Sequence, residues 1–374
     1  MIGHLPRLAL ALGLFLSQPA QAAPDLKTMH GVWRGMIGNL PVHVCYGASE
    51  YSNDGKYFYM RRLSTIPLRA DEKVAGELTE GWADTKGVAR WRMKAIAKNR
   101  AEGIWTGNGR TLPIRLTRLP FATSEEFDSP CGSLAFVQPI VAATRIVKSP
   151  RRVHGLAVEK WTLAFPDENV SVESFQLLGT GPAIAAINRR LREPFDKSDE
   201  GWKWCLRNAG AWGGDYHDEV EARLVTAHWL SVMSYNESFC GGAHPNNSNQ
   251  PILFDRQSGR SVDLYTWFGS ASSNREKVEG YSETIDTLTG KLFNLVLTLH
   301  PRASESEEDC GGAVKTASSW TLELKREGIG FTPDLPRVVM ACGDEVVLPW
   351  NKLAPFLSRS GKREVAALRA ELRR

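Results

Sequence analysis

A pattern of fourteen residues occurs twice in this sequence, and it limits how the first third of the chain can fold. Residues 31–44 and 103–116 carry Gly, Trp, Gly, Leu and Pro at matching positions, with a constant offset of 72. Each copy alternates large and small residues around a Gly-rich turn, which predicts a β-hairpin. Further strand-like runs lie between the copies. We therefore expect residues 23–140 to form a small all-β barrel or sandwich with an internal hairpin repeat.

Four tryptophans of this predicted domain allow two interpretations. Their rings could line a groove that binds sugars, because aromatic faces stack well on the apolar faces of sugar rings. Alternatively they belong to the core of a small barrel, and the strand-like alternation favours the core. The four are Trp33, Trp82, Trp91 and Trp105.

The first 22 residues read as a secretory signal peptide. His4 and Arg7 give a positive start, and the following apolar run is only about half as long as a membrane-spanning helix. Ala20-Gln21-Ala22 has the small-x-small form that signal peptidases accept, so we expect cleavage near Ala22. No later stretch is long and apolar enough for a transmembrane anchor. The sequence predicts a soluble protein, periplasmic or secreted.

Six cysteines follow the predicted cleavage site, an even number in a chain bound for an oxidising compartment. Fifteen pairings are possible in principle. If two domains fold separately, Cys45 must pair with Cys131, and chain order then favours Cys205 with Cys240 and Cys310 with Cys342. Without a C-x-x-C motif or a close His/Cys cluster, we expect disulfides and predict neither a metal nor a cofactor.

The length and net charge of the chain exclude some classes of function. The chain of 374 residues has a formal charge of +4, which becomes +3 without Arg7. Its basic residues are interspersed with acidic ones, so we do not expect a nucleic-acid-binding protein. Breaks in periodicity make residues 120–150 look like a linker, and they place the domain boundary near residues 140–155. We assign residues 141–154 as the linker. About 350 residues are enough for two domains with separate cores.

Residues 155–360 mix strand-like and helix-like segments, and we predict an α+β domain with an antiparallel sheet and helices. Gly181-Pro182 opens a helix, and residues 275–299 have a helical spacing of apolar side chains. Residues 338–342 read as a strand, and residues 353–357 as a short helix. The tail, residues 361–374, has Val365, Leu368 and Leu372 at helical spacing and reads as a surface helix.

Several motifs in this second domain resemble those of a known family. They read C-G-G-A-H-P at 240–245, F-D-R-Q-S-G-R-S-V-D-L at 254–264, G-I-G-F-T-P-D-L-P-R at 328–337 and V-V-L-P-W-N-K-L at 346–353. Over roughly residues 155–360 the chain is similar to the RsiV-like, PdaC-type extracytoplasmic domain family of bacterial envelope proteins. The first domain shows no such resemblance. This sequence also lacks the sigma-binding and transmembrane segments of an anti-sigma factor and a deacetylase domain.

The resemblance implies binding rather than catalysis, because the family domain captures lysozyme as a signal in the anti-sigma factor. We therefore predict a non-enzymatic envelope protein that binds a lysozyme-like muramidase or a cell-wall component such as peptidoglycan glycan. The residues that we expect to contact the partner are Gly241, Gly242, His244, Asn246 and Asp255.

A hydrolase that uses the loop around His244 is the alternative. His244 with Asp255 or Asp263 is the nearest acid–base set, and Ser248 is a conceivable nucleophile. No G-x-S-x-G, S-x-x-K or H-E-x-x-H spacing accompanies them. The Gly pair before His244 is better explained by a tight turn with positive φ. We therefore predict no catalytic residues.

Overall fold

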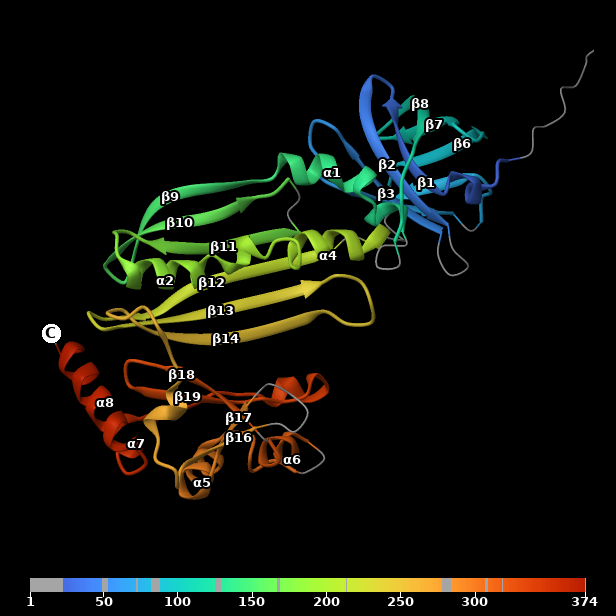
Figure 1. Cartoon of the computed structure of the whole chain (residues 1–374). Coiled ribbons are helices and arrows are strands. Elements are labelled where there is room, and N and C mark those ends of the chain that lie inside the picture. Colours follow the sequence, from blue (N-terminus) through green and yellow to red (C-terminus); the bar gives the residue numbers. More distant parts are fainter. Residues whose placement is uncertain are drawn as a thin grey trace, which may run out of the picture.

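Three modules follow one another along the chain: a β-barrel, a long sheet with helices on one face, and a C-terminal module of short strands and helices (Figure 1). The computed structural model describes residues 23–48, 53–71, 73–81, 88–124, 129–166, 169–212, 214–277, 284–306, 309–317 and 319–373. The predicted signal peptide, residues 1–22, lies outside the described residues. A barrel followed by an α+β arrangement is the fold class that the sequence predicts.

The first module is a closed antiparallel barrel in the described part of residues 23–124. Each strand pairs with its neighbours in sequence, and β1 also pairs with β8, so no edge is left open. The two predicted hairpins are β1–β2 and β7–β8. The strands are β1 Gly31–Ile37, β2 Leu40–Ala48, β3 Asn53–Tyr59, β4 Ile66–Ala70, β5 Glu77–Glu80, β6 Arg90–Ile96, β7 Arg100–Gly107 and β8 Arg110–Leu119.

The barrel interior is filled with aromatic side chains. Trp33 and Trp91 are fully buried and Trp105 nearly so, which confirms the prediction that these residues form the core. Trp82 lies outside the described residues. The indoles of Trp91 and Trp105 both donate to Oε1 of Glu80, at 3.0 and 2.6 Å. At the other end, a short helix, η1 (Leu26–Met29), closes the barrel, and Trp33 donates to the Met29 carbonyl at 2.8 Å.

The second module is a mixed sheet of seven strands among the described residues, in the order β15-β14-β13-β12-β11-β10-β9. All pairs are antiparallel except β11 with β12. Because parallel neighbours need a crossover, the chain between them forms helices that cover one face of the sheet. The strands are β9 Arg145–Val153, β10 Leu156–Ala164, β11 Val170–Leu177, β12 Asp215–Val225, β13 Trp229–Phe239, β14 Asn246–Asp255 and β15 Ser261–Val262. The crossover holds α2 Pro182–Leu191, α3 Glu193–Asp196, α4 Trp202–Asn208 and η3 Gly210–Trp212.

The predicted linker is wrong as a description of residues 141–154. A helix, α1 (Leu134–Ala143), runs into its first residues, and the edge strand β9 occupies most of the rest. Nearly every side chain of β9 is exposed, so burial imposes no alternation of apolar residues on it. A solvated edge strand with Pro150 and several basic residues therefore looks like a linker at the sequence level.

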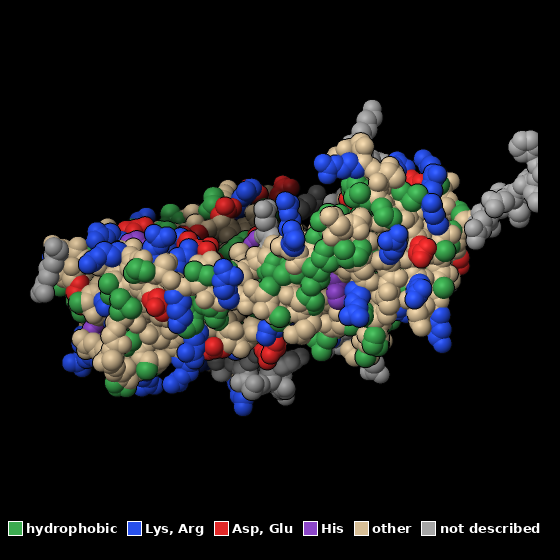
Figure 2. All heavy atoms as spheres, turned by 90° about the horizontal axis from the view of Figure 1, so that it is seen from above, with side chains coloured by type: hydrophobic (Ala, Val, Ile, Leu, Met, Phe, Trp, Pro, Cys, Tyr) green, Lys and Arg blue, Asp and Glu red, His purple; other side chains and the backbone are tan. Residues whose placement is uncertain are grey.

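A hydrophobic cluster joins the barrel to the sheet. The short helix η2 (Pro130–Gly132) and α1 bring Phe136, Val137 and Ile140 onto the outer wall of the barrel, against Val32 and Phe58. Leu206 from α4 completes the cluster from the sheet side. Figure 2 looks down on this junction and shows further hydrophobic side chains at its surface.

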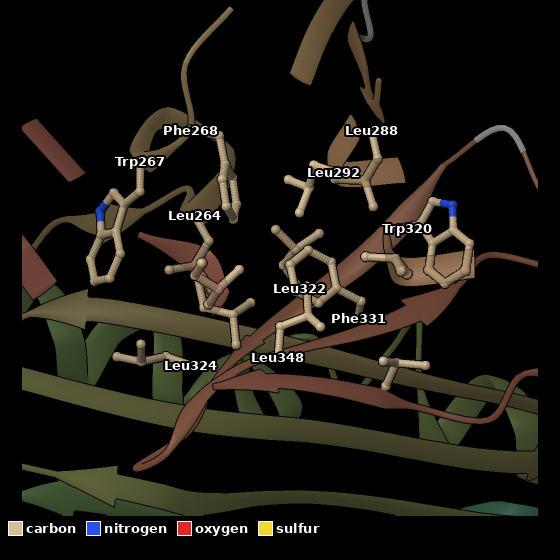
Figure 3. Close-up of a cluster of buried hydrophobic side chains, with 14 of the residues drawn as sticks. Leu264, Trp267, Phe268, Leu288, Leu292, Trp320, Leu322, Leu324, Phe331 and Leu348 are labelled. Atoms are coloured by element: carbon tan, nitrogen blue, oxygen red, sulfur yellow. The ribbon is translucent and has the colours of Figure 1, made fainter. Parts of the chain in front are cut away.

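The C-terminal module packs its own small sheet, β18-β19-β20, beside β14. Figure 3 shows its core, where Leu322, Phe331 and Leu348 of this sheet meet Leu264 and Leu292 from the surrounding helices. The elements are η4 Leu264–Trp267, β16 Ser273–Lys277, β17 Thr284–Leu288, α5 Gly290–Leu299, α6 Cys310–Lys315, β18 Trp320–Leu324, β19 Gly328–Pro333, η5 Arg337–Cys342, β20 Val346–Pro349, α7 Trp350–Leu353 and α8 Arg359–Glu371.

Three local predictions in this module need correction. Only the second half of the helix predicted over residues 275–299 exists, as α5; the first part is the hairpin β16–β17, with residues 278–283 outside the description. Residues 338–342 lie in the 3-10 helix η5, because Val338 is almost fully exposed and has no neighbouring strand. The short helix predicted at residues 353–357 is instead α7, which ends at Leu353. The predicted tail helix is present as α8. It packs one side into the core, because Val365 and Leu368 are buried.

All six cysteines lie in the described part of the chain and form three disulfides. The pairs are Cys45–Cys131, Cys205–Cys240 and Cys310–Cys342, as chain order predicts. Disulfides of this kind are typical of proteins from oxidising compartments outside the cytoplasm. None of the helices among the described residues has the length and apolar character needed to cross a membrane.

Candidate functional site

The predicted partner-contact loop connects β13 to β14. Gly241 and Gly242 have φ angles of 90° and 89°, so both adopt the left-handed conformation that glycine favours, in agreement with the predicted turn. His244 is exposed at the tip. Asn246 begins β14, and its Oδ1 accepts a hydrogen bond of 2.7 Å from Arg337 of η5. The structure thus brings these four predicted residues together at one end of the sheet.

Asp255 does not join them. It ends β14, whose ten residues span about 30 Å at the usual rise of a strand. There it accepts backbone hydrogen bonds from Gln257 and Ser258, at 2.8 and 3.3 Å, and so stabilises the turn into β15. Asp263 follows that same turn, at the start of η4. The proposed acid–base sets of His244 with Asp255 or Asp263 are therefore not assembled.

A pocket opens between α2–α3 and the face of the sheet that the helices cover, and on β14 its lining begins at Gln250, four residues after Asn246. Its volume is about 380 Å³, within the range of pockets that hold small molecules. Strands β12, β13 and β14 form its floor, and the helices with the following turn form its rim. The lining residues are Arg190, Leu191, Glu193, Pro194, Lys197, Glu200, Gly201, Tyr216, Asp218, Val220, Ser234, Gln250 and Ile252.

Asp218 is the ionisable group on the pocket floor. The hydroxyl of Tyr216, two residues away on the same face of β12, donates to its Oδ2 at 3.2 Å. Asn236 stands directly opposite on β13, and its Nδ2 donates to the carbonyl of His217 at 3.4 Å. Burial raises the pKa of Asp218, and the polar side chains of Tyr216 and Asn236 offset part of that rise. A carboxylate that is costly to desolvate is thus held at the base of an open pocket.

The rim carries opposite charges that pair with one another. Glu193 of α3 forms an ion pair with Arg190 of α2, and Lys197 lies 3.4 Å from the same carboxylate. Arg190 also donates to Oε1 of Gln250 at 3.2 Å, which ties the helix to β14 across the pocket edge. At Gly201, a Cβ atom would lie 2.7 Å from the Tyr216 hydroxyl, so only glycine leaves room for that hydroxyl.

The loop and the pocket share one face of the sheet. Tyr216 pairs with Ser238, and Ser238 pairs with Asn246, so Asn246 lies two strand spacings, about 10 Å, from Tyr216. In the neighbouring row of paired residues, Asp218 of β12 pairs with Asn236 of β13, and Asn236 pairs with Ser248 of β14. A ligand that fills the pocket and extends along this face would reach the predicted contact loop.

Sequence reasoning missed Tyr216 and Asp218. The run Asp215-Tyr216-His217-Asp218 contains three polar residues out of four, and no apolar pattern marks it as part of a covered strand. Alternation was the available signal: Tyr216, Asp218 and Val220 form one face of the strand, and that face is the covered one. Polar residues on a covered face are unusual enough to indicate a site.

The chemistry of this pocket is that of hydrogen bonding and charge. The floor offers a carboxylate, a phenol, a serine hydroxyl and a side-chain amide, which suit a ligand with several hydroxyl or N–H groups. In the described ranges, no three His, Cys, Asp or Glu side chains cluster closely enough to hold a metal ion.

Comparisons with known proteins give structural neighbours only. No family model and no curated protein matches the sequence. Two solved structures of DUF3298 family proteins are similar to this chain, each with a TM-score of 0.35. The one from Bacteroides fragilis is 14% identical and covers 61% of this chain and 95% of its own. The one from Pseudomonas aeruginosa is 13% identical and covers 58% of this chain and 95% of its own. The resemblance to the RsiV-like family stays a prediction.

Proposed function

We propose that this protein is a non-enzymatic binding protein of the cell envelope, and that it holds a polar cell-wall component in the pocket beneath α2 and α3. The observation that supports this most directly is the carboxyl of Asp218, which is largely desolvated yet lies on the floor of a pocket of about 380 Å³. Keeping a charge in such a place costs free energy unless a ligand pairs with it.

The donors and acceptors in the pocket indicate the kind of ligand. Asp218 accepts N–H and O–H groups or an ammonium group, and Ser234 and Gln250 can both donate and accept. Leu191, Val220 and Ile252 add apolar surface that suits the faces of a sugar ring. An amino-sugar glycan with a peptide branch, as in peptidoglycan, carries all of these groups.

A lysozyme-like muramidase remains the protein partner to test. The loop with Gly241, Gly242 and His244 precedes β14, and Asn246 lies four residues before the pocket residue Gln250 on that strand, so a protein large enough to cover this end of the sheet would contact both. The hydrolase alternative also concerns this loop, and measurement of cell-wall turnover tests it in the same samples.

The first experiment titrates the oxidised protein with soluble peptidoglycan fragments and with N-acetylglucosamine oligomers by calorimetry. We expect binding that falls at least about tenfold in Asp218→Asn, because one charge-assisted hydrogen bond is lost. Glu102→Gln, an exposed carboxylate on the barrel wall, is the matched control and should bind like the wild type.

Asp218→Asn also has a stability readout that separates loss of binding from loss of folding. Because burial raises the pKa of Asp218 in the folded protein, the ionised carboxyl destabilises the fold above that pKa, and this cost disappears as the pH falls below the ordinary value of 3.8. We therefore expect the variant to be at least as stable as the wild type at pH 7. Binding that is unchanged in this folded variant would contradict the proposal, and so would a wild type that binds no fragment. Binding of a muramidase with lost turnover would move the function to the loop.

A further inference from the structure

Helix α1 combines two properties that rarely occur together on a protein surface. Its sequence, Leu134 to Ala143, contains no charged residue. Yet only one side is covered, by the junction with the barrel. Leu134 is 58% exposed, and beyond the helix Ile146 and Val147 are 42% and 44% exposed. The exposed side of the helix carries Leu134 with the uncharged Gln138 and Ala142, and a large apolar side chain exposed close to Ile146 and Val147 requires an explanation.

The apolar surface continues onto the barrel. The carbonyl of Ala135 is bonded to His43, so the start of α1 lies over the row of outward-facing side chains that contains His43. The next outward-facing row along these strands contains Met36 and Pro41, and Met60 is bonded to the Pro41 carbonyl. Met36 and Met60 are both exposed. We name Leu134, Ile146, Val147, Met36 and Met60 the α1 patch.

Basic residues surround the α1 patch. Arg34 shares the row of His43, Arg115 pairs with Met36, and Arg145 begins β9 two residues after α1 ends. From Ser129 to Val158 the sequence contains no Asp or Glu, while Arg145, Lys148, Arg151 and Arg152 give it four positive charges. Two carboxylates adjoin these basic residues: Glu102 pairs with Arg115 across the strands, and Glu159 lies 3.5 Å from Lys148. Figure 2 shows this arrangement, with hydrophobic side chains between the barrel and the long sheet and Lys and Arg around them.

We propose that the α1 patch docks this protein onto an anionic phospholipid surface. An apolar stretch too short to span a bilayer and flanked by cations is suited to the interface, where the apolar side chains enter the headgroup layer and the cations bind phosphates. Charge distinguishes this partner from a second copy of the chain. Two copies that met through the α1 patch would bring Arg34, Arg115 and Arg145 against like charges.

Vesicle sedimentation tests the proposal. The oxidised mature protein is mixed with vesicles of phosphatidylglycerol and phosphatidylcholine, or of phosphatidylcholine alone, at low and high salt. We expect co-sedimentation with the anionic vesicles, weakened by salt and by removal of phosphatidylglycerol. Leu134→Glu and Arg145→Glu should each lower the bound fraction by roughly tenfold.

Val338→Glu is the matched control, because Val338 is 92% exposed and lies in η5, in the C-terminal module. It should bind vesicles like the wild type, and thermal melting of all variants shows whether they are folded. Failure of the wild type to sediment with anionic vesicles at low salt would overturn the proposal. An equal loss in Val338→Glu would overturn it as well. Light scattering that shows a dimer, with Leu134→Glu monomeric and vesicles unbound, would assign the α1 patch to self-association instead.

Discussion

At the scale of single residues, His43 compensates for a break in the hydrogen bonding of α1. Pro139 lies inside that helix and has no N–H for the carbonyl of Ala135, four residues earlier. Nε2 of His43 lies 2.9 Å from that carbonyl and supplies the missing donor from the barrel wall. The ring stacks on Phe58, with centroids 5.4 Å apart. This interaction requires the neutral tautomer with its proton on Nε2 or the charged ring.

The titration of His43 gives a prediction about pH. Burial lowers its pKa below the ordinary value of 6.5, the bond to Ala135 partly restores it, and nearby Arg34 lowers it further. Between 6.5 and the lowered pKa, the unfolded chain binds a proton that the folded chain does not, so stability falls as the pH drops through this window. His43→Gln can still donate to Ala135 but does not titrate. We expect urea unfolding at pH 7.5 and pH 5 to show a smaller loss of stability in the variant. Equal losses in the two proteins would contradict this role of His43.

At the scale of elements, α8 shows that tertiary packing can make glycine more favourable than alanine inside a helix. The helix begins at the N-cap Ser358, whose hydroxyl accepts from the N–H of Gly361 at 3.1 Å. Glycine inside a helix normally costs about 1 kcal/mol relative to alanine. Here a Cβ at position 361 would lie 2.1 Å from the carbonyl oxygen of Trp267 in η4. The glycine allows α8 to approach the core so closely that Val365 and Leu368 become buried.

Gly361→Ala should therefore destabilise the protein, although it favours the isolated helix. We expect a loss of about 2 kcal/mol, since the clash is with backbone and α8 must move away from η4. Denaturant unfolding followed by tryptophan fluorescence measures it. Lys362→Ala, at the exposed neighbouring position, should change stability by less than about 0.5 kcal/mol. A Gly361→Ala protein as stable as the wild type would show that α8 is not held at this contact.

At the scale of the whole molecule, the junction couples the barrel to the sheet. Phe136 and Val137 of α1 are fully buried between Val32 and Phe58 of the barrel and Leu206 of α4. The disulfide Cys45–Cys131 ties β2 to η2 within the same cluster. The N–H of the Arg207 side chain also donates to the carbonyl of Gly132, at 2.9 Å. A shared core of this kind makes independent unfolding of the two modules unfavourable.

Calorimetry of Phe136→Ala tests this coupling. In the wild type we expect the barrel and the long sheet to unfold in one transition. The variant should lose about 3–5 kcal/mol through the cavity it leaves, and the barrel should then melt separately from the sheet. Leu134→Ala, on the exposed side of the same helix, should keep a single transition. Two separate transitions already present in the wild type would disprove the coupling.

The sequence alone predicted a small all-β barrel or sandwich and the class of the second domain, because strand alternation and helical spacing are local patterns. The repeat around Trp33 and Trp105 predicted both hairpins, and the order of six cysteines predicted the pairing once two domains were assumed. The loop of Gly241 and Gly242 was also predictable, since positive φ angles select glycine locally.

Only the tertiary structure decided which of the candidate site residues come together. His244 and Asp255 are eleven positions apart in sequence, but the extended strand between them keeps them at opposite ends of the sheet. Asp218, Asn236 and Ser248 become neighbours through the register of three strands, which depends on long-range pairing. The pocket exists because the parallel pairing of β11 and β12 requires a crossover, and that crossover places α2 and α3 over Asp218. Registers and crossovers are set by burial of the whole sheet, which no local pattern specifies.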